Sequence, residues 1–590
     1  MSETKMKRIS ELQDLVFDGV TNPYVPPAEL NISDKLELHS EFGSDLDPVT
    51  FEVIRNAVVN MTEEMAVTVR RAAFSTNIKT RADFSCAFFD SKLRCIAQSF
   101  AQPAHLVAMA TIAPVSIREF GPDHLDAGDA IVVNDPHRGA SHLNDVTIIS
   151  PVEIHGQRIG YVANMAHHVD VGGSSPASLG VNKELCQEGI ILPPTRIARR
   201  GEIDDNVIKL ILANLRAPRE TNGDLRAQMS ANVVGIRRMA ALQDKYTAEL
   251  LEIFFDELID YTDRWTERAF RSLPEGTYEA EGYRDDDGFS DEPVLLKVKV
   301  TIKDGHVHLD PSGSSQQRMS PINCVRPMAK CGIAYVARCL VDDGIPVNDG
   351  FLNRVHVDGP DGLVCTATRP AAVVGGWELV SRMAELIFLS LHPVMPDRIP
   401  AAGKGCIVNI GFGGPDPRRG EYYCYMETIA GGNGARPTKD GPDGVQTNLQ
   451  NTENAPIEEV ELHYPIRIKR YELITDSCGA GKFRGGMAIR RDFEFPYADC
   501  SWTVLSDGRK FAPWGLLGGK EGSCSRFIFD PDGENRDLPS KCSIEVPRGG
   551  CVRVETPGAG GFGYPNDRNP EAVRNDLRDE KISSTSARED

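Results

Sequence analysis

The chain lacks the cysteine pairs of zinc ribbons and dithiol redox proteins. Its 14 cysteines are scattered from Cys86 to Cys551, and no two of them form a C-x-x-C pair. A structural zinc site or a thioredoxin-like motif needs that spacing. We therefore expect most of these thiols to be buried as small hydrophobic side chains in a reducing compartment, which makes the cytoplasm the default location.

Long apolar runs and basic clusters are also missing. No segment approaches the roughly 20 apolar residues that span a bilayer, and the N-terminus lacks the apolar core of a signal peptide. The formal net charge is −20, from 85 acidic and 65 basic side chains, without a block of lysine and arginine. We therefore expect neither nucleic acid nor an anionic membrane as a partner.

Familiar hydrolase and nucleotide motifs are absent or incomplete. The nucleophile elbow G-x-S-x-G and the zinc-protease motif H-E-x-x-H do not occur. The segment CGAGKF, residues 478–483, is close to a phosphate-binding loop, but Asp476 replaces the first glycine. Phe483 stands where Ser or Thr would hold Mg²⁺, so the segment is not expected to bind a nucleotide.

The length of 590 residues predicts several lobes, because single compact cores rarely grow beyond 250–300 residues. Apolar residues make up 41% and charged residues 25%, which is typical of a folded protein. We predict a multi-lobed, mixed α+β fold. The expected parts are an extended arm (1–45), a metal-site α+β domain (46–274), an α+β middle domain (275–400), a Gly-rich, β-rich domain (401–565) and a charged tail (566–590).

Local patterns predict the main elements. Asp47 and Pro48 are typical of a helix start, and apolar residues follow at helical spacing as far as Val69. Residues 87–173 indicate short strands, and 275–310 alternate around a hairpin turn at Asp304-Gly305. Further helices are expected at 205–272, 325–342 and 376–391. The apolar-poor tail is expected to be mobile or docked on a partner.

Histidines gather in one part of the chain. Seven of the 13 lie between His105 and His168. If the strands around residues 145 and 167 form a hairpin about residues 155–156, Asp145 lies opposite a residue near Ala166 or His167. His142, Asp145 and His167 would then converge. Two imidazoles and a carboxylate leave coordination positions open, as catalytic metal sites require. The alternative is that these side chains only cap strands and loops.

The assembled motifs resemble the hydantoinase B/oxoprolinase family from Asp47 to about Arg578. The stretches that carry the resemblance are Arg81-Ala-Asp83-Phe-Ser85, Asn134-Asp135-Pro136, His142-x-x-Asp145, Ala166-His167-His168-Val-Asp170-Val-Gly-Gly173, Asn214-Leu-Arg216, Gly223-Asp224-Leu225, Pro321-Ile-Asn323, Glu427-Thr-Ile-Ala-Gly431-Gly432, Pro513-Trp514-Gly515, Gly518-Gly519 and Thr556-Pro-Gly558-x-Gly560-Gly561-x-Gly563. Each motif alone is weak, and together they are specific.

The resemblance implies a partner and a metal. Family members work beside a hydantoinase A-type subunit with an ATPase fold, so ATP and Mg²⁺ are expected on a partner, in a heterotetramer of two A-type and two B-type chains. The implied metal site, for Zn²⁺ or Mn²⁺, falls on His142, Asp145 and His167, with Asp83 as a further ligand. His168 and Asp170 become candidates for proton transfer or for orienting ligands.

Three functions remain open at this point. The first is ATP-dependent hydrolysis of a lactam or hydantoin-type ring. The second is ATP-dependent carboxylation of a ketone of the acetone or acetophenone type, in which bicarbonate is phosphorylated. The third is a scaffold that only positions the A-type subunit. The compact B-type chain without large insertions favours hydrolysis.

Overall fold

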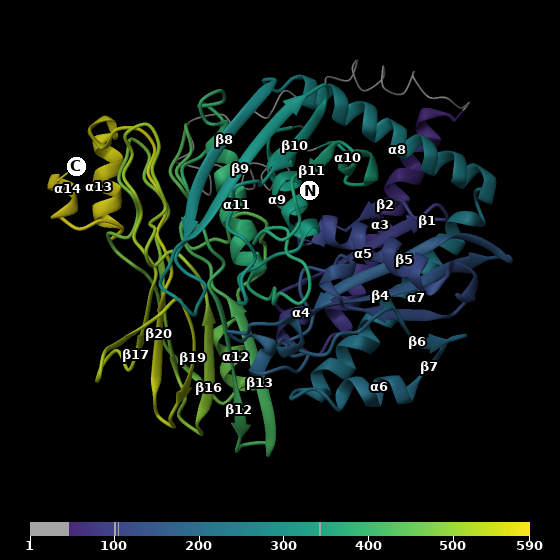
Figure 1. Ribbon diagram of the computed structural model, residues 1–590, viewed down its shortest axis with the longest axis horizontal. Helices are drawn as coiled ribbons and strands as arrows, with labels where there is room; N and C mark the ends of the chain where they lie inside the picture. The colour runs from purple at the N-terminus through teal and green to yellow at the C-terminus, as the bar shows by residue number, and fades with distance from the viewer. Residues whose placement is uncertain (1–45, 100–101, 104, 342–343, 590) are drawn as a thin grey trace, which may run out of the picture.

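The computed structural model describes residues 46–99, 102–103, 105–341 and 344–589, so the expected arm over residues 1–45 lies outside the described residues. In Figure 1 the N-terminal sheet lies at the right, the middle sheet at the top, and the two C-terminal sheets at the left. The mixed α+β prediction is therefore confirmed. No helix among the described residues is both long and apolar enough to cross a bilayer.

The N-terminal sheet is antiparallel throughout and has seven strands. Alternate residues of one strand point to opposite faces, and here both faces are buried, since Phe88 and Phe89 belong to different cores. In spatial order the strands are β2 (Cys95–Gln98), β1 (Phe84–Asp90), β5 (Gln157–His167), β4 (Asp145–Ile154), β3 (Ala130–Val133), β6 (Thr195–Arg199) and β7 (Glu202–Ile203).

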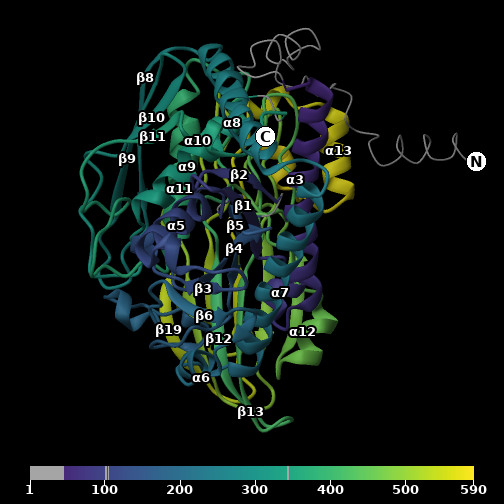
Figure 2. The ribbon, with the colours of Figure 1, turned by 90° about the vertical axis from the view of Figure 1, so that its right-hand side faces the viewer.

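Helices cover both faces of this sheet. On one face, α3 (Pro48–Ala72) packs on β1 and on α7 (Pro218–Gln243), which lies on β4 and β5. Figure 2 shows α5 (His105–Phe120) on the opposite side. Asp47 caps α3 by accepting from the backbone N–H groups of Val49 and Thr50, as predicted. The predicted helical region 205–272 is also confirmed by α6 (Asp205–Leu212), α7 and α8 (Ala248–Arg271).

Helix α5 corrects the prediction of strands over the whole of 87–173. Its sequence hides the helix for two reasons. Pro114 lies inside it, where proline normally interrupts a helix. Most of its surface is also buried, so its apolar residues do not follow a one-sided helical period.

The middle sheet has one face on helices and one face open. Its order is β11 (Val355–Val357), β10 (His306–Asp310), β9 (Val294–Lys303) and β8 (Gly276–Arg284). Helix α11 (Gly376–Leu391) packs on β8, β9 and α9 (Arg326–Cys339), which confirms both predicted helices. Asp304 and Gly305 have φ of 51° and 72°, the left-handed pair of a two-residue hairpin turn.

The C-terminal part is β-rich, as predicted. One sheet has the order β13 (Glu421–Thr428), β12 (Asn409–Asp416), β16 (Cys500–Leu505), β19 (Lys541–Val546). The other has the order β14 (Arg467–Leu473), β15 (Ile489–Glu494), β20 (Cys551–Glu555), β17 (Arg526–Phe529), β18 (Arg536–Leu538). A separate hydrophobic core around Phe412 and Trp502 joins them. The largest core instead continues across the expected 274/275 division, because it includes Phe254 and Val298.

The described part of the tail contacts the rest of the chain. It contains α13 (Pro570–Arg578) and α14 (Ser586–Glu589). The Arg568 guanidinium donates to Asp440 at 2.8 Å and to Asp576 at 2.6 Å. Arg484 also donates to Asp576, at 3.1 Å. Arg568 and Asp576 of the tail are therefore paired within the chain. Short elements elsewhere are α4 (Thr76–Lys79), α10 (Asp349–Leu352) and α12 (Ile457–His463).

Candidate metal centre

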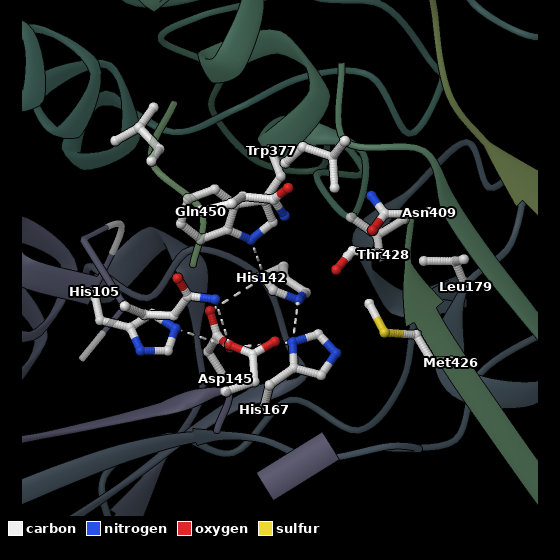
Figure 3. A pocket seen from close by; sticks show the side chains of 15 residues that line it. His105, His142, Asp145, His167, Leu179, Trp377, Asn409, Met426, Thr428 and Gln450 are labelled. Atoms are coloured by element: carbon white, nitrogen blue, oxygen red, sulfur yellow. Dashed lines mark hydrogen bonds and ion pairs between the residues drawn. The ribbon is translucent and has the colours of Figure 1, made fainter. Parts of the chain in front are cut away.

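The β4–β5 hairpin brings the predicted ligand residues together. His155 and Gly156 form its turn with φ of 53° and 76°, and Asp145 pairs directly with His167. His142 lies in the short loop before β4, where its carbonyl accepts from the Asp145 N–H at 3.2 Å. Figure 3 shows the three side chains pointing toward one another. The predicted hairpin register is confirmed.

Among the residues that the structure describes, His142, Asp145 and His167 are the one group of three such side chains with ligand atoms within 4.8 Å of one another. His142 Nε2 lies 3.1 Å from His167 Nδ1. The Asp145 oxygens lie 3.3 Å from His142 Nδ1 and 3.4 Å from His167 Nδ1. Asp145 is 0% exposed, so its charge must be balanced by neighbouring groups.

The electrostatic environment keeps Asp145 ionised. Burial alone would raise the pKa of this carboxyl, but His142 and His105 outweigh it and hold the pKa well below the usual range. Burial lowers the pKa of His142 despite the attraction of Asp145. At neutral pH the centre therefore offers a carboxylate and a neutral imidazole, which are the forms that bind metal ions.

His105 completes the surroundings of Asp145. It begins α5, its Nε2 lies 3.6 Å from Asp145 Oδ1, and its Nδ1 lies 3.1 Å from Ser85 Oγ. Burial lowers the pKa of His105, but the Asp145 carboxylate more than offsets this, so the net shift is upward. Ser141 Oγ donates to Asp145 Oδ2 on the other side. Asp145 is thus held by several groups at once.

The centre fits a divalent cation. Asp145 Oδ1 is buried and has no hydrogen-bond partner among the described residues. Buried polar atoms are rarely left without a partner. Two nitrogens bound tetrahedrally at about 2.05 Å from Zn²⁺ would lie about 3.3 Å apart, close to the 3.1 Å between His142 Nε2 and His167 Nδ1. Two nitrogens and one oxygen suit Zn²⁺, Mn²⁺ or Fe²⁺.

Trp377 fixes the hydrogen bonding of His142. Its indole N–H can only donate, and it lies 2.9 Å from His142 Nδ1. In this arrangement Nδ1 accepts, so the ring proton is on Nε2 and faces His167 Nδ1. An ion bound between the two rings would displace that proton.

Of the other predicted site residues, one lines the pocket and two do not. Asp83 lines the same pocket, outside the group of three, and its Oδ1 accepts from Gln102 Nε2 at 3.1 Å. His168 and Asp170 do not line it. His168 Nε2 instead lies 2.9 Å from Gln228 Oε1, and Asp170 accepts from the Arg216 N–H at 2.8 Å.

The centre forms one side of a small pocket with a cavity volume of about 30 Å³, enough for an ion or a water molecule. The opposite side comes from α11, β12, β13 and nearby loops, and Figure 3 shows part of it across from the histidines. We call this side the neutral wall; it consists of Leu179, Val374, Trp377, Ile407, Asn409, Met426, Thr428, Leu449 and Gln450. Gln450 Oε1 is buried there and has no hydrogen-bond partner in the described ranges.

Strained backbone surrounds the pocket. Non-glycine residues with positive φ directly adjoin or belong to its lining at Ala82, Ser178, Val408, Asn448 and Leu449. Val408, at 58°, is β-branched and therefore especially disfavoured in this conformation. Such conformations persist where the fold fixes them and gather at functional sites.

Sequence reasoning missed most of the neutral wall. Trp377 was inside a predicted helix and Gln450 inside a predicted β-rich region, but neither had a motif at metal-binding or catalytic spacing. His105 belongs to the cluster of histidines between residues 105 and 168, and this clustering was the one sequence signal for it. These residues reach the pocket through long-range packing, which local spacing does not encode.

Known proteins are similar to this chain over most of its length. The family model described as Hydantoinase B/oxoprolinase matches residues 47–565. The B-type subunit of a putative D-/L-hydantoinase from a Pseudomonas species is 31% identical over 575 residues, covering 93% of this chain and 95% of the relative.

Solved structures show the same fold. The ATP-dependent caprolactamase from Pseudomonas jessenii has a TM-score of 0.87 and 28% identity, covering 92% of this chain and 96% of that one. An acetone carboxylase in its nucleotide-free state has a TM-score of 0.86 at 18% identity, covering 94% and 80%. The second likeness is one of fold alone.

Proposed function

Because this chain belongs to the hydantoinase B/oxoprolinase family, we propose that it is the metal-binding subunit of a two-subunit, ATP-dependent cyclic amidase. The substrate is a lactam or hydantoin-type ring, and the product is the open-chain amino acid. The family includes ATP-dependent hydrolases, and the caprolactamase fold covers nearly the whole chain.

One observation carries this proposal. A fully buried carboxylate with one orphaned oxygen and two imidazoles face a small pocket with a cavity volume of about 30 Å³. A scaffold has no need of an unsatisfied buried carboxylate oxygen beside a pocket, because such an atom destabilises the fold. A bound metal ion would satisfy it.

His142, Asp145 and His167 would hold a divalent ion such as Zn²⁺ or Mn²⁺. The bound ion supplies polarisation of the ring carbonyl or a bound water of lowered pKa. Asp83, which lines the same pocket, is our candidate for a further ligand. For His168 and Asp170 we propose positioning roles, because their contacts with Gln228 and Arg216 anchor the segment that follows His167.

The neutral wall would bind the ring after moving away from the metal centre, because a lactam is larger than the cavity of about 30 Å³. A cyclic amide presents an apolar ring, one carbonyl oxygen and, in an unsubstituted lactam, one N–H. Leu179, Val374 and Met426 offer apolar contact, and Gln450 Oε1 is an open acceptor for the ring N–H.

ATP is needed because an unstrained amide is a weak electrophile. We propose that an A-type ATPase subunit, with Mg²⁺, transfers the γ-phosphoryl group of ATP to the amide oxygen. Water then attacks the ring carbon, the C–N bond breaks, and a second water releases phosphate. The balance is lactam, ATP and two waters giving amino acid, ADP and phosphate. A heterotetramer of two A-type and two B-type chains is the assembly we propose.

The direct test uses the complex of this chain with its A-type subunit. Lactams, hydantoins and ketones are incubated with ATP, with and without bicarbonate, and the products are identified by mass spectrometry. We expect ring-opened amino acid and one ADP per ring, independent of bicarbonate. A new carboxylate on carbon would instead identify a ketone carboxylase.

A variant separates catalysis from scaffolding. His142→Ala is expected to abolish turnover while the complex remains assembled, as checked by size-exclusion chromatography. The matched control is His155→Ala, because His155 is a turn residue with a side chain 72% exposed. Full turnover in His142→Ala would leave only the scaffold role.

A further inference from the structure

A second histidine cluster lies on the open face of the middle sheet. His306 and His308 are two residues apart on β10 and therefore share a face. His356 on β11 pairs directly with His308 in parallel register. The buried face of this sheet is formed by the alternate residues, such as Val307 and Leu309. Three imidazoles thus meet on a surface away from the pocket already described.

Two of the three rings already present a nitrogen pair at metal-binding spacing. His306 Nδ1 lies 3.0 Å from His356 Nε2. That distance fits one shared proton, and it is also close to the roughly 3.3 Å expected for two nitrogens on a tetrahedral Zn²⁺. The buried centre has the same feature, with 3.1 Å between His142 Nε2 and His167 Nδ1.

The third imidazole is adjacent and carries its own carboxylate. The His308 ring stacks on the His356 ring with centroids 4.5 Å apart, and its Nδ1 lies 3.0 Å from Asp358 Oδ2. The His308 side chain is 36% exposed and that of Asp358 is 53% exposed. Rotation about the side-chain torsions of a half-exposed ring is rapid, so His308 can turn a nitrogen toward an ion held by the other two.

We propose that His306, His308 and His356, assisted by Asp358, form a second site for a divalent transition-metal ion such as Zn²⁺ or Ni²⁺. The ion links β10 to the short edge strand β11 and so stabilises this edge of the sheet. The site is weaker than the buried centre, because only two of its three imidazoles converge without rotation and because water competes on the open face.

Metal titration tests this site in the untagged complex with the A-type subunit. The complex is stripped with a chelator, and Zn²⁺ binding is followed by calorimetry. We expect two equivalents per chain, one tighter and one weaker, and a rise in melting temperature as the weaker site fills. Metal-free His142→Ala should lose the tighter equivalent and keep the weaker one.

The double variant His306→Asn/His356→Asn should show the reverse. It should lose the weaker equivalent, keep the tighter one and retain ring-opening activity, because neither residue lines the pocket. His155→Asn, which removes another surface imidazole, should keep both equivalents. Asp358→Asn should weaken the second site by about tenfold, as expected for loss of an orienting carboxylate.

Two results would overturn the second site. One is a single equivalent in the unaltered chain. The other is an undiminished weaker equivalent in the double variant with an unchanged circular dichroism spectrum. Either result leaves the proposed function intact. If the unaltered chain instead binds Zn²⁺ without a tighter equivalent, that result counts against the buried centre alone.

Discussion

The two sides of the pocket hold their acidic groups in opposite states. On the side of the β4–β5 hairpin, Asp145 is buried among histidines that keep its pKa well below the usual range. Behind the neutral wall, Glu188 accepts from the N–H groups of Val373 and Val374, and burial raises its pKa to about 8 despite these bonds. Burial, together with repulsion from Asp507, likewise raises the pKa of Glu378 to about 7.

This difference assigns different tasks to the two sides. A charged side attracts a cation, and a neutral side accepts an uncharged ring without competing for that cation. Changes to the hairpin side should therefore alter ion binding and turnover together. Changes to the neutral wall should alter substrate recognition or stability while the ion stays bound.

The largest effect is expected from Asp145→Asn. The amide keeps the shape but removes the charge that binds the ion, and a metal contributes several kcal/mol to stabilising the transition state. We expect kcat to fall by about 1000-fold, with loss of bound metal measured by elemental analysis. The same change at Asp244, which is 70% exposed, should leave both unchanged. Full activity in Asp145→Asn would remove the contrast between the two sides.

The next effect is expected at Gln450. Replacing it by leucine removes the open acceptor, which is worth roughly 1–3 kcal/mol when a buried donor is left unpaired. We expect KM for an unsubstituted lactam to rise by about 10- to 100-fold, with metal content unchanged. An N-methylated lactam has no N–H to donate, so the variant and the unaltered enzyme should have the same KM for it. An equal rise in KM for both lactams would contradict this role for Gln450.

A smaller effect is expected at Trp377, which belongs to the neutral wall but contacts a metal ligand. When an ion occupies His142 Nε2, the ring proton belongs on Nδ1, where Ser141 Oγ lies 2.8 Å away and can accept it. The indole then loses its acceptor. In the unaltered chain, ion binding breaks this hydrogen bond, at a cost of roughly 1 kcal/mol. Trp377→Phe has no such bond to lose, so we expect about fivefold tighter Zn²⁺ binding.

Fluorescence provides the readout for Trp377. Zn²⁺ should change the tryptophan emission of the metal-free protein, and Trp377→Phe should abolish that change. Trp502→Phe is the matched control, because Trp502 is buried in the separate C-terminal core. A metal-dependent change that survives in Trp377→Phe would show that this indole does not respond to the ion.

The smallest effect on turnover is expected at Glu188, where the change concerns stability. Because folding raises the pKa of this acid from 4.5 to about 8, its contribution to stability is fully present below pH 4.5 and is lost as pH rises toward 8. The loss is at most about 1.4 kcal/mol per pH unit. Glu188→Gln mimics the protonated acid and should match the unaltered chain at pH 4.5 but melt higher at pH 8. The same difference in melting temperature between Glu188→Gln and the unaltered chain at both pH values would contradict a neutral Glu188.

The hairpin side could be predicted from the sequence, and the neutral wall could not. Asp145 and His167 are joined by one turn, so counting residues from His155-Gly156 was enough to place them opposite each other. Trp377, Asn409 and Gln450 reach the pocket through long-range contacts, such as the hydrogen bond from Trp377 to His142, which residue spacing does not encode. Helix α5 was also missed, because Pro114 and burial on most sides removed its helical period.

Metal analysis of the active complex tests the central claim most directly. It is best done in the His306→Asn/His356→Asn background, where the buried centre is the one site that we expect to bind an ion. The account predicts one divalent ion per chain, with ring-opening activity proportional to occupancy and restored when the ion is added back after chelation. Full activity in a preparation without bound metal would contradict it.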